Sequence, residues 1–526
     1  MFPVLSNNKT LNQLLFLIIN LKPCLMKNNL LIWKFSAVFF LLFLIAGCEK
    51  DDEAQERLEF LVPINFSTIQ ASIDAASHGD TITVLPGVYK ENIDFKGKNV
   101  IVRSIAPENP DTVALTIIDG GNSGPVVRFE SGESEGAVLY GFTITNGSAG
   151  TTGDGGGIRI SDGSSPGIKT NIIKNNTARY GAGIMVSNQS EPYITRNIFY
   201  QNNATGGRGA GIYVFNQSAP VITGNIIKEH EGSDGVIHIG GNNAGQNATA
   251  YITGNLINNN VTDFGTGAIK VTQNSDVLIS GNTIAYNHGT GDNSAAAITI
   301  SFNSTADINN NTINNNTATR AGAVIIYRES VATITDNVIT GNIAGDNDSY
   351  NGIGGGIMLT YYGSATITGN SITNNKAWSH AHGGGAIAIY SWGQKTTAVI
   401  ENNDIYNNHA YRRGGGVYVA GSATNVVIKN NIISQNKAEN HTTATGGAMY
   451  FGDIEEAIIY GNSISGNHSH WRGGGIFFHR NAVVKDSNGV EWPKENSPPA
   501  NEPNNTYSNN THLNDAHMGA DVYFDD

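Results

Sequence analysis

A short pattern of Asn, alternating Ile and clustered Gly returns along most of this chain. The first Asn of each unit recurs at intervals of about 26 to 33 residues, a period typical of solenoids, propellers and arrays. A unit of that length cannot bury its own apolar face, so it must stack on its neighbours. The first asparagines of the units are Asn171, Asn197, Asn225, Asn255, Asn282, Asn311, Asn337, Asn370, Asn403, Asn431 and Asn462.

Inside each unit the apolar residues alternate at a spacing of two. Examples are Ile158-Arg159-Ile160 and Ile184-Met185-Val186. This spacing indicates strands, and the repeats contain no helical apolar stripe. We therefore predict an all-β fold, a parallel β-helix of roughly a dozen coils, each with two or three short strands joined by Gly and Asn turns.

The recurring residues have mainly architectural roles in such a fold. Inward Ile and Val stack from coil to coil and bury a continuous core. Asn at a turn tolerates a left-handed backbone, and its amide can bond the Asn above and below it as a ladder. Gly triplets such as Gly155 to Gly157 and Gly414 to Gly416 permit positive φ and close approach between coils.

A short helix is expected ahead of the repeats. The stretch Ser67 to Gln70 fits a capping box, and Ile69, Ile73 and Ala76 fall on one helical face before Gly79 ends the helix. We expect this helix to cover the open N-terminal end of the core.

The sequence after this helix resembles that of a known protein superfamily. GDTITVLPGVYKENIDFKGKNVIVRSI from Gly79, GFTITNG from Gly141 and the Gly-Gly-Gly-Ile units resemble right-handed β-helix proteins of the pectin-lyase-like superfamily, from Asn65 to the end. The resemblance implies a right-handed fold. It does not imply one activity, because the superfamily holds lyases, hydrolases, epimerases and non-enzymatic adhesins. The units also resemble GGAI/FxxN repeats of polymorphic outer-membrane adhesins, with Ile where those have Phe.

The N-terminus has the pattern of a secretory signal. From Met26 the chain reads MKNNLLIWKFSAVFFLLFLIAGC, a basic start followed by an apolar run too short to span a membrane. We assign residues 1–25 to an upstream, non-native start and residues 26–47 to a signal peptide. Ile45 to Cys48 resembles the lipobox of bacterial lipoproteins, which makes Cys48 the expected lipidation site.

The residues after Cys48 bear on localisation. Glu49-Lys50-Asp51-Asp52-Glu53 resembles the export tag of Bacteroidetes lipoproteins, which implies anchoring at the cell surface of the outer membrane. We expect residues 48–62 to be a tether and 63–526 one β-helix domain with a loop insertion at 486–504. The only other cysteine is Cys24, so packing and hydrogen bonds must stabilise the domain without disulfides.

The net charge of the chain limits the classes of binding partner that we expect. The net charge is -13 over 526 residues, and a nucleic-acid partner would call for a basic face. We expect no nucleic acid, a lipid anchor, an acidic polysaccharide partner and a monomeric chain.

The main candidate site lies on four consecutive coils rich in His, Arg and aromatic residues. Aromatic faces next to cationic donors suit sugar rings that carry carboxylate or sulfate groups. The residues are Trp378, His380, His382, His409, Tyr411, Arg412, Arg413, His441, His468, His470, Trp471 and Arg472, with Tyr390, Trp392 and Tyr418 on outward strand positions.

Three interpretations of this cluster remain open. It can be a polar turn face bonded to its own backbone. It can be a lyase or epimerase site, in which Arg413 neutralises a uronate carboxylate, His382 or His470 removes the C5 proton and Tyr390 protonates the leaving oxygen. It can hold a metal through the His380/His382 and His468/His470 pairs, although no carboxylate is evidently placed beside them.

The lyase interpretation divides the cluster by role. The catalytic candidates are His382, Arg413, Tyr390, His470 and Arg472, and the substrate-binding candidates are Trp378, Trp392, Tyr411, Arg412, Tyr418, His441 and Trp471. Whether a metal takes part is unknown.

Other positions give weaker signals. A secondary candidate site comprises Arg208, Tyr213, Asp234, His238 and Lys270, since Lys beside Arg on adjacent coils resembles pairs used by β-helix lyases. No cofactor is certain, and Asp346 to Asp348 form a possible Ca²⁺ loop, although an exposed polar loop explains them as well.

The sequence thus favours a surface lipoprotein that binds an acidic extracellular polysaccharide and cleaves it by β-elimination. The alternative is a non-catalytic adhesin or glycan-binding rod.

Overall fold

The computed structural model describes residues 59–525 except 151, 233, 241–246, 263–264, 291–294, 346–350, 392, 394, 422–423, 480, 493–504 and 513–520. Several predictions lie outside these residues: the upstream start at 1–25, the signal peptide, lipidation at Cys48, the export tag at Glu49 to Glu53, the Asp346 to Asp348 loop and Trp392. Among the described helices, none is long and apolar enough to cross a membrane.

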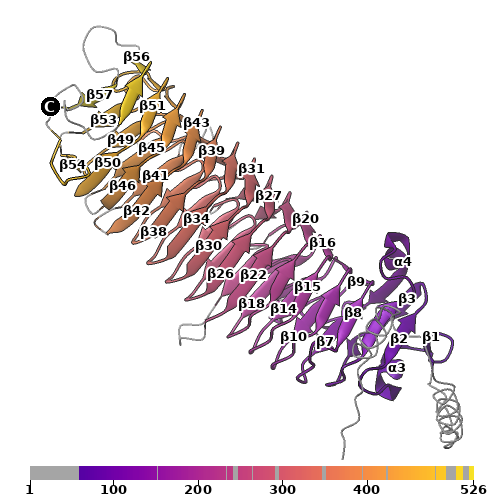
Figure 1. Ribbon diagram of the computed structural model, residues 1–526. Helices are drawn as coiled ribbons and strands as arrows, with labels where there is room; N and C mark the ends of the chain where they lie inside the picture. The colour runs from indigo at the N-terminus through magenta and orange to yellow at the C-terminus, as the bar shows by residue number, and fades with distance from the viewer. Residues whose placement is uncertain are drawn as a thin grey trace, which may run out of the picture. The chain divides into compact units, whose positions relative to one another are not determined.

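One coil shows how the chain closes on itself. Strand β10 (Ile158–Ile160) leads to β11 (Gly167–Lys169), β12 (Ile172–Lys174) and β13 (Thr177–Tyr180), and β14 (Ile184–Val186) then begins the next coil. Strand β14 pairs in parallel with β10, with Ile184 opposite Ile158. Figure 1 shows these coils following one another along the described domain, from indigo to yellow.

Three long parallel sheets run the length of this domain. Sheet A has 16 strands, from β1 (Phe60–Val62) to β54 (Val484–Lys485), and includes β11. Sheet B has 15 strands, from β3 (Gly87–Lys90) to β55 (Thr506–Ser508), and includes β12. The prediction of an all-β parallel β-helix is confirmed. Strand β1 takes up the last three residues of the segment that we assigned to a tether.

Sheet C, also of 15 strands, carries both candidate sites. Its strands begin just after the Gly-rich turns, where the sequence alternates most regularly. They are β4 (Ile93–Asp94), β7 (Val127–Phe129), β10, β14, β18 (Ile212–Phe215), β21 (Ile237–Gly240), β25 (Ile269–Thr272), β29 (Ile298–Ile300), β33 (Val324–Ile326), β37 (Ile357–Leu359), β41 (Ile387–Tyr390), β45 (Val417–Ala420), β49 (Met449–Phe451), β53 (Ile476–Phe478) and β57 (Val522–Phe524).

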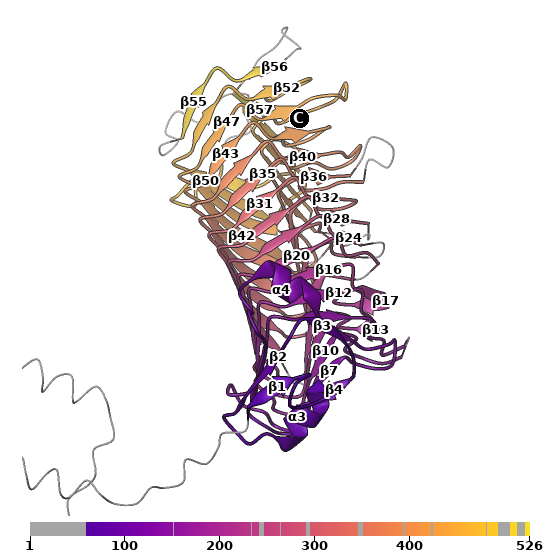
Figure 2. The ribbon, with the colours of Figure 1, turned by 90° about the vertical axis from the view of Figure 1, so that its right-hand side faces the viewer.

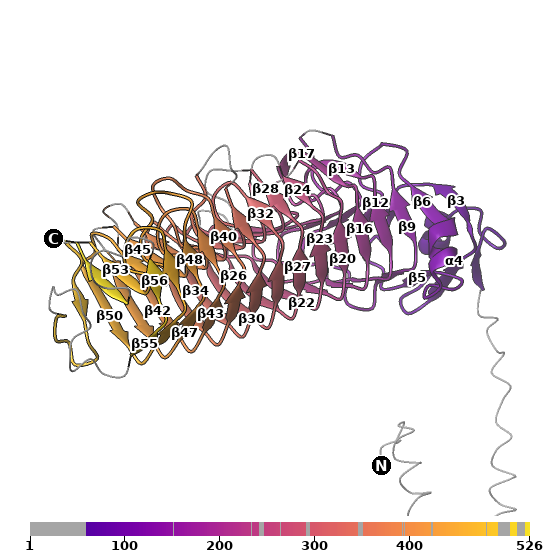
Figure 3. The same cartoon turned by 90° about the horizontal axis from the view of Figure 1, so that it is seen from above.

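A fourth sheet, sheet D, was not predicted. It follows sheet B in the coils from Val261 onward, and each of its strands has only two residues, too few to show an alternating pattern (Figure 3). Its nine strands are β24 (Val261–Thr262), β28 (His288–Gly289), β32 (Thr317–Ala318), β36 (Ile343–Ala344), β40 (Lys376–Ala377), β44 (His409–Ala410), β48 (Lys437–Ala438), β52 (His468–Ser469) and β56 (Thr511–His512). Strand β13 pairs separately with β17 (Asn203–Arg208).

The core is a column of inward aliphatic side chains. Ile158, Ile168 and Ile173, one from each long sheet of a coil, are fully buried, and the same positions are filled in the next coil. Burying each such side chain contributes about 1.5–3 kcal/mol. The C-terminal coils add aromatic rings, with Phe478 stacked on Phe524 at 4.6 Å. The core is therefore continuous.

The predicted asparagine ladder is present at the turn between sheets A and B. The amide nitrogen Nδ2 of Asn197 donates to Oδ1 of Asn225 at 3.1 Å and to the Ile168 carbonyl at 2.9 Å. Its Oδ1 accepts from the backbone nitrogen and from Nδ2 of Asn171. Each buried amide is thereby fully bonded, which removes the cost of burying it.

A second ladder, at the turn between sheets B and D, was missed. It passes through Asn176 and Asn202 and resumes at Asn260 and Asn287, each five residues after a member of the first ladder. Between the two stretches His230 takes the Asn position. His230 is completely buried, and neither ring nitrogen has a hydrogen-bond partner of normal geometry. The five-residue spacing of paired asparagines is the signal that predicts this ladder.

Helix α3 (Ile69–Ala75) covers the N-terminal end of the core, as predicted, and contacts β1, β2 (Thr81–Val84) and β4. Its cap differs from the expected box. Thr68 rather than Ser67 caps the helix, and its side chain accepts from the Ala71 amide. The Glu91 carboxylate accepts from the backbone amides of Ile69 and Gln70. Gln70 instead bonds Asp74 and the Asp94 carbonyl.

A second helix, α4 (Pro110–Leu115), was not predicted and lies against sheet B (Figure 2). Its start has a recognisable signal, because Asn109 caps it and Pro110 occupies the first turn.

The Gly triplets act as expected. Gly414 has φ of 60°, and a Cβ on Gly415 would lie 2.4 Å from the Gly447 carbonyl oxygen of the next coil.

Within the predicted loop insertion at 486–504, Trp492 is buried and packs edge-on against Phe478 at 5.6 Å. Strand β57 closes sheet C, as expected for the C-terminal strand.

Candidate functional site

The outward face of sheet C in the C-terminal half is built from stacked aromatic rings. Tyr418, Tyr450, Phe477 and Tyr523 are in register on successive strands. Successive ring centroids lie 5.4 Å apart and the rings are nearly parallel. The sequence pattern places Tyr418 on an outward strand position. The first three rings are nevertheless buried, because loops from sheet D fold over them.

The loops that cover this stack bring arginines onto it. Backbone bridges join neighbouring residues just ahead of the Gly triplets, in the order Gly383, Arg413, Thr445 and Arg472, so Arg413 and Arg472 stand in one column. The Arg413 guanidinium lies 5.1 Å from the Tyr450 ring centroid. A cation over a ring face gains favourable energy from the ring quadrupole.

His382, Tyr390, Arg413 and Tyr418 meet in one cavity of about 410 Å³, which we call the cleft. The His382 ring lies 4.2 Å from that of Tyr390, and its Nδ1 is 3.2 Å from the Tyr418 hydroxyl. The sequence analysis had selected all four. Tyr450, Asp453 and His479 also line the cavity.

Protonation in the cleft is set by burial and by arginine. Burial first, and then Arg320, Arg413 and Arg412, lower the pKa of His382 to about 4, so its imidazole is neutral at pH 7. Burial raises the pKa of Tyr390 to about 12 and that of Tyr418 further still, so both phenols keep their protons.

The arginines at the cleft have no direct carboxylate partner among the described residues, because Asp453 of the cavity wall contacts His479 at 3.1 Å instead. Within the described part of the chain, Arg320, Arg412 and Arg413 form no ion pair with a carboxylate. Arg412 and Arg413 donate instead to the carbonyls of His380 and Ala381, at 2.6 and 2.7 Å. A carbonyl satisfies a donor without neutralising it, so an anion entering the cleft gains strong attraction.

A second group, the rim cluster, stands at the sheet D side. It comprises Trp378, His380, His409, Tyr411 and His441. The His380 ring lies 4.9 Å from that of Tyr411 and 6.2 Å from that of His441. The bond from Arg412 to the His380 carbonyl joins the rim cluster to the cleft. Three predicted substrate-binding residues, Trp378, Tyr411 and His441, therefore lie together.

The remaining predicted residues lie apart from the cleft. Arg472 stacks on Trp471 at 4.0 Å and on Tyr523 at 4.7 Å, and pairs with Asp525 at 3.3 Å, so its charge is compensated. Of the two histidines considered as bases, His382 lines the cavity and His470 does not. Arg320 and Tyr450 were not selected, although both fall in the columns from which the other residues were chosen.

The secondary candidate site is also assembled, and its lysine pairs with its aspartate, whereas Arg208 has no ion pair with a carboxylate within the described ranges. Lys270 Nζ lies 2.5 Å from Asp234 Oδ2, and His238 Nδ1 lies 2.7 Å from the Asp234 carbonyl. Burial alone would raise the pKa of Asp234, but Lys270 and His238 hold it below its usual value. Burial lowers the pKa of His238 to about 3. Tyr213 packs on His238 at 5.3 Å, and Arg208 is bridged to Asp234 in the backbone.

A metal site is the third interpretation of the main candidate cluster. In the described residues no group of three or more His, Cys, Asp or Glu side chains is placed to hold a metal ion.

Comparison with known proteins addresses the fold. No curated protein is similar enough to this chain to count as a relative. The family model described as "Right handed beta helix region" matches residues 108–257, 208–371 and 355–525, which together span most of the chain. These matches agree with the coils described above and confirm the predicted handedness. The chain belongs to the right-handed β-helix family.

Proposed function

We propose that the cleft binds an acidic extracellular polysaccharide and cleaves it by β-elimination. The observation that carries this proposal is the placement of a neutral, largely buried His382 among arginines that have no carboxylate partner. A uronate carboxylate would supply the missing negative charge.

The cleft residues divide the reaction between them. Arg413 binds the uronate carboxylate and stabilises the charge that develops when the C5 proton leaves. His382 accepts that proton. The C5–H electron pair forms the C4–C5 double bond, the C4–O bond breaks, and Tyr390 gives its proton to the leaving oxygen. Proton transfer from His382 back to Tyr390 through water restores both groups.

Substrate binding also prepares the base. Guanidinium charge is one cause of the low pKa of His382, and a bound carboxylate offsets that charge. The pKa of His382 therefore rises in the complex, which makes it a stronger proton acceptor than in the free protein.

A glycan-binding rod without catalysis is the second candidate. The contact between His382 Nδ1 and the Tyr418 hydroxyl favours it, because this contact can hold the imidazole as a fixed part of the wall.

We further propose that Cys48 carries the lipid that anchors the protein at the outer face of the outer membrane. The support is the lipobox at Ile45 to Cys48 and the acidic stretch that follows. Replacing Cys48 with Ala should release the protein from the membrane fraction, and protease added to intact cells should degrade the wild type. Protection in intact cells would contradict surface exposure.

The enzymatic proposal is tested with purified protein on alginate, pectate, chondroitin and ulvan, following the ultraviolet absorbance of the unsaturated uronate product. One polymer should give a rise that His382→Gln abolishes. His288→Gln, on strand β28 of sheet D and outside both candidate sites, serves as the matched control and should keep most of the rate. A flat trace on all four polymers, together with retention of the protein on one of them, would favour the rod.

A further inference from the structure

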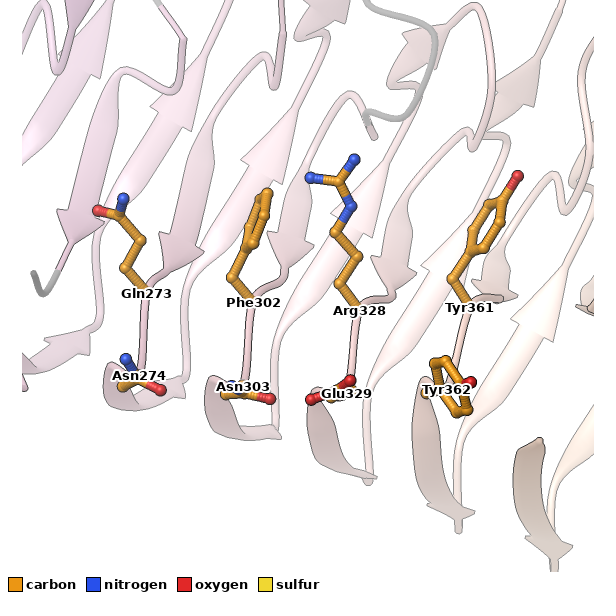
Figure 4. Close-up of a pocket in the computed structure, with 8 residues that line it drawn as sticks. All are labelled: Gln273, Asn274, Phe302, Asn303, Arg328, Glu329, Tyr361 and Tyr362. Carbon is orange, nitrogen blue, oxygen red and sulfur yellow. The ribbon is translucent and has the colours of Figure 1, made fainter. Parts of the chain in front are cut away.

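A row of exposed side chains occupies another edge of the solenoid, at the turns from sheet C to sheet A. Four successive coils place two-residue turns here: Gln273-Asn274, Phe302-Asn303, Arg328-Glu329 and Tyr361-Tyr362. They line a cavity of about 370 Å³. Figure 4 shows the first residues of the four pairs side by side and pointing the same way, with the second residues in a separate row. We call Gln273, Phe302, Arg328 and Tyr361 the turn row.

The backbone of these turns is left-handed, a conformation that Gly and Asn adopt more easily than the residues found here. Phe302, Arg328 and Tyr361 have φ of 56°, 54° and 46°, in the left-handed region where Asn and Gly are favoured. Two earlier coils have amide residues at the same turn. There Asn216 donates to Asn188 at 2.7 Å and Gln189 to Gln217 at 2.9 Å, which bonds the turns to one another. Three consecutive coils thus replace a self-bonded amide turn with bulkier side chains at a cost in backbone energy.

The side chains that replace the amides face solvent. Phe302 and Tyr361 are 41% and 38% exposed. The Arg328 guanidinium lies 4.3 Å from the Phe302 ring centroid and 5.5 Å from that of Tyr327. It forms no ion pair with any carboxylate in the described ranges. Two exposed aromatic faces therefore flank a cation that is held in place but not neutralised.

The spacing of the turn row matches a polymer. Neighbouring coils are about 4.8 Å apart, so Phe302 and Tyr361 stand about 10 Å apart with Arg328 midway. One pyranose unit of an extended glycan advances by a similar distance to one coil. We infer that the turn row binds a strand of acidic polysaccharide parallel to the solenoid axis, with sugar rings on Phe302 and Tyr361 and a carboxylate on Arg328.

The turn row also lies next to the cleft. Strand β37 pairs with β41 in register, with Leu359 opposite Ile389, so the turn that carries Tyr361 is one coil away from Tyr390 at the end of β41. A strand held on the turn row therefore passes beside Tyr390. This guiding role rests on the function proposed above, whereas binding by the turn row does not.

The test is affinity electrophoresis of the whole protein in gels that contain polygalacturonate, alginate or neutral dextran. The triple variant Phe302→Asn/Arg328→Asn/Tyr361→Asn should bind the acidic polymer roughly tenfold more weakly, since it loses ring and cation contacts. Its melting temperature should be unchanged or higher, because Asn accepts the left-handed turn. Tyr286→Asn and Arg196→Asn are the matched controls, with φ of 56° and 54° on other edges, and should bind as the wild type does.

Single substitutions separate the contacts. Arg328→Asn alone should weaken binding of the acidic polymer and leave binding of the neutral polymer unchanged. Wild-type protein that migrates freely in all three gels, or a triple variant that binds like the wild type, would overturn the inference. His382→Gln should be retarded like the wild type while forming no product, so failure of the turn row and failure of the cleft give different results.

Discussion

The two candidate sites occupy the same face of the same sheet, yet they differ in one respect. Near the N-terminal end, Lys270 is paired with Asp234 and the buried His238 bonds a backbone carbonyl. Near the C-terminal end, His382 is half-buried and neutral, and Arg413 beside it donates to the Ala381 carbonyl and lies over the Tyr450 ring but pairs with no carboxylate of the described residues.

The comparison indicates that stacked outward residues of sheet C stabilise the fold where their charges pair with one another, and can bind a ligand where they do not. A paired column stabilises the protein and leaves nothing for a ligand to neutralise. An unpaired column costs stability and attracts an anion. On this basis we propose that the pair of Lys270 and Asp234 stabilises the fold and that the cleft binds the ligand.

The largest expected effect comes from breaking the paired column. Lys270→Met would leave the partly buried Asp234 without its cation, which should lower the free energy of unfolding by about 3 kcal/mol, the lower end of what breaking a buried pair costs. Urea denaturation measures the change. Adding Asp234→Asn should restore most of the loss, and product formation should be unchanged in both variants. A loss of activity at full stability would instead make this column a site.

Breaking the unpaired column should affect activity rather than stability. Arg413→Gln should lower kcat/KM by roughly a hundredfold or more, because charge stabilisation at the carboxylate is lost. Arg159→Gln is the control, an outward arginine of sheet C that pairs with Glu130 at 2.8 Å. If both variants react at the wild-type rate, the cleft is not the reacting centre.

The two columns can also be made alike. Thr445 lies beside Arg413 in the backbone pairing, and Thr445→Asp would give that arginine a carboxylate partner, as Asp234 does for Lys270. Affinity for the acidic polymer should fall roughly tenfold, because the substrate no longer supplies the only counter-charge. Thr445→Asn, of the same size and uncharged, should bind like the wild type.

The smallest expected effect concerns the second asparagine ladder, at the turn between sheets B and D, where His230 takes the Asn position. His230→Asn would restore the missing amide and remove two unbonded ring nitrogens, which should raise the free energy of unfolding by about 1 kcal/mol at pH 7. Burial lowers the pKa of His230 from 6.5 to about 3 in the folded protein. The unfolded chain therefore binds the proton first as pH falls, and the folded state loses stability below pH 6.5.

The pH dependence sharpens this test. The stability advantage of His230→Asn over the wild type should widen by about 1.4 kcal/mol for each pH unit between 6.5 and 3. Denaturation curves at several pH values measure it. A constant difference would mean that His230 is already protonated or solvated in the fold.

Much of the architecture could be read from the sequence because it repeats. Asn171 and its counterparts predicted the first ladder, and the Gly triplets predicted the close contacts between coils. The short strands of sheet D escaped notice because two residues cannot show a period. The columns on sheet C were predictable for the same reason as the ladder.

What could not be predicted depends on contacts between distant segments. The outward rings of Tyr418 and Tyr450 are buried because loops fold over them, which their alternation does not reveal. Arg472 and Arg413 occupy equivalent positions in the sequence pattern. Only the approach of Asp525, 53 residues further along the chain, separates the paired arginine from the unpaired one.

The asparagine ladders have a consequence for how such a chain changes over generations. Every amide in a ladder meets the same partners, so the gain or loss of one whole coil leaves the neighbouring bonds as they were. Duplication inside the gene would then lengthen the protein in steps of about 4.8 Å without a new core. Natural selection can thus adjust how many sugar units the surface spans independently of which sugar it recognises.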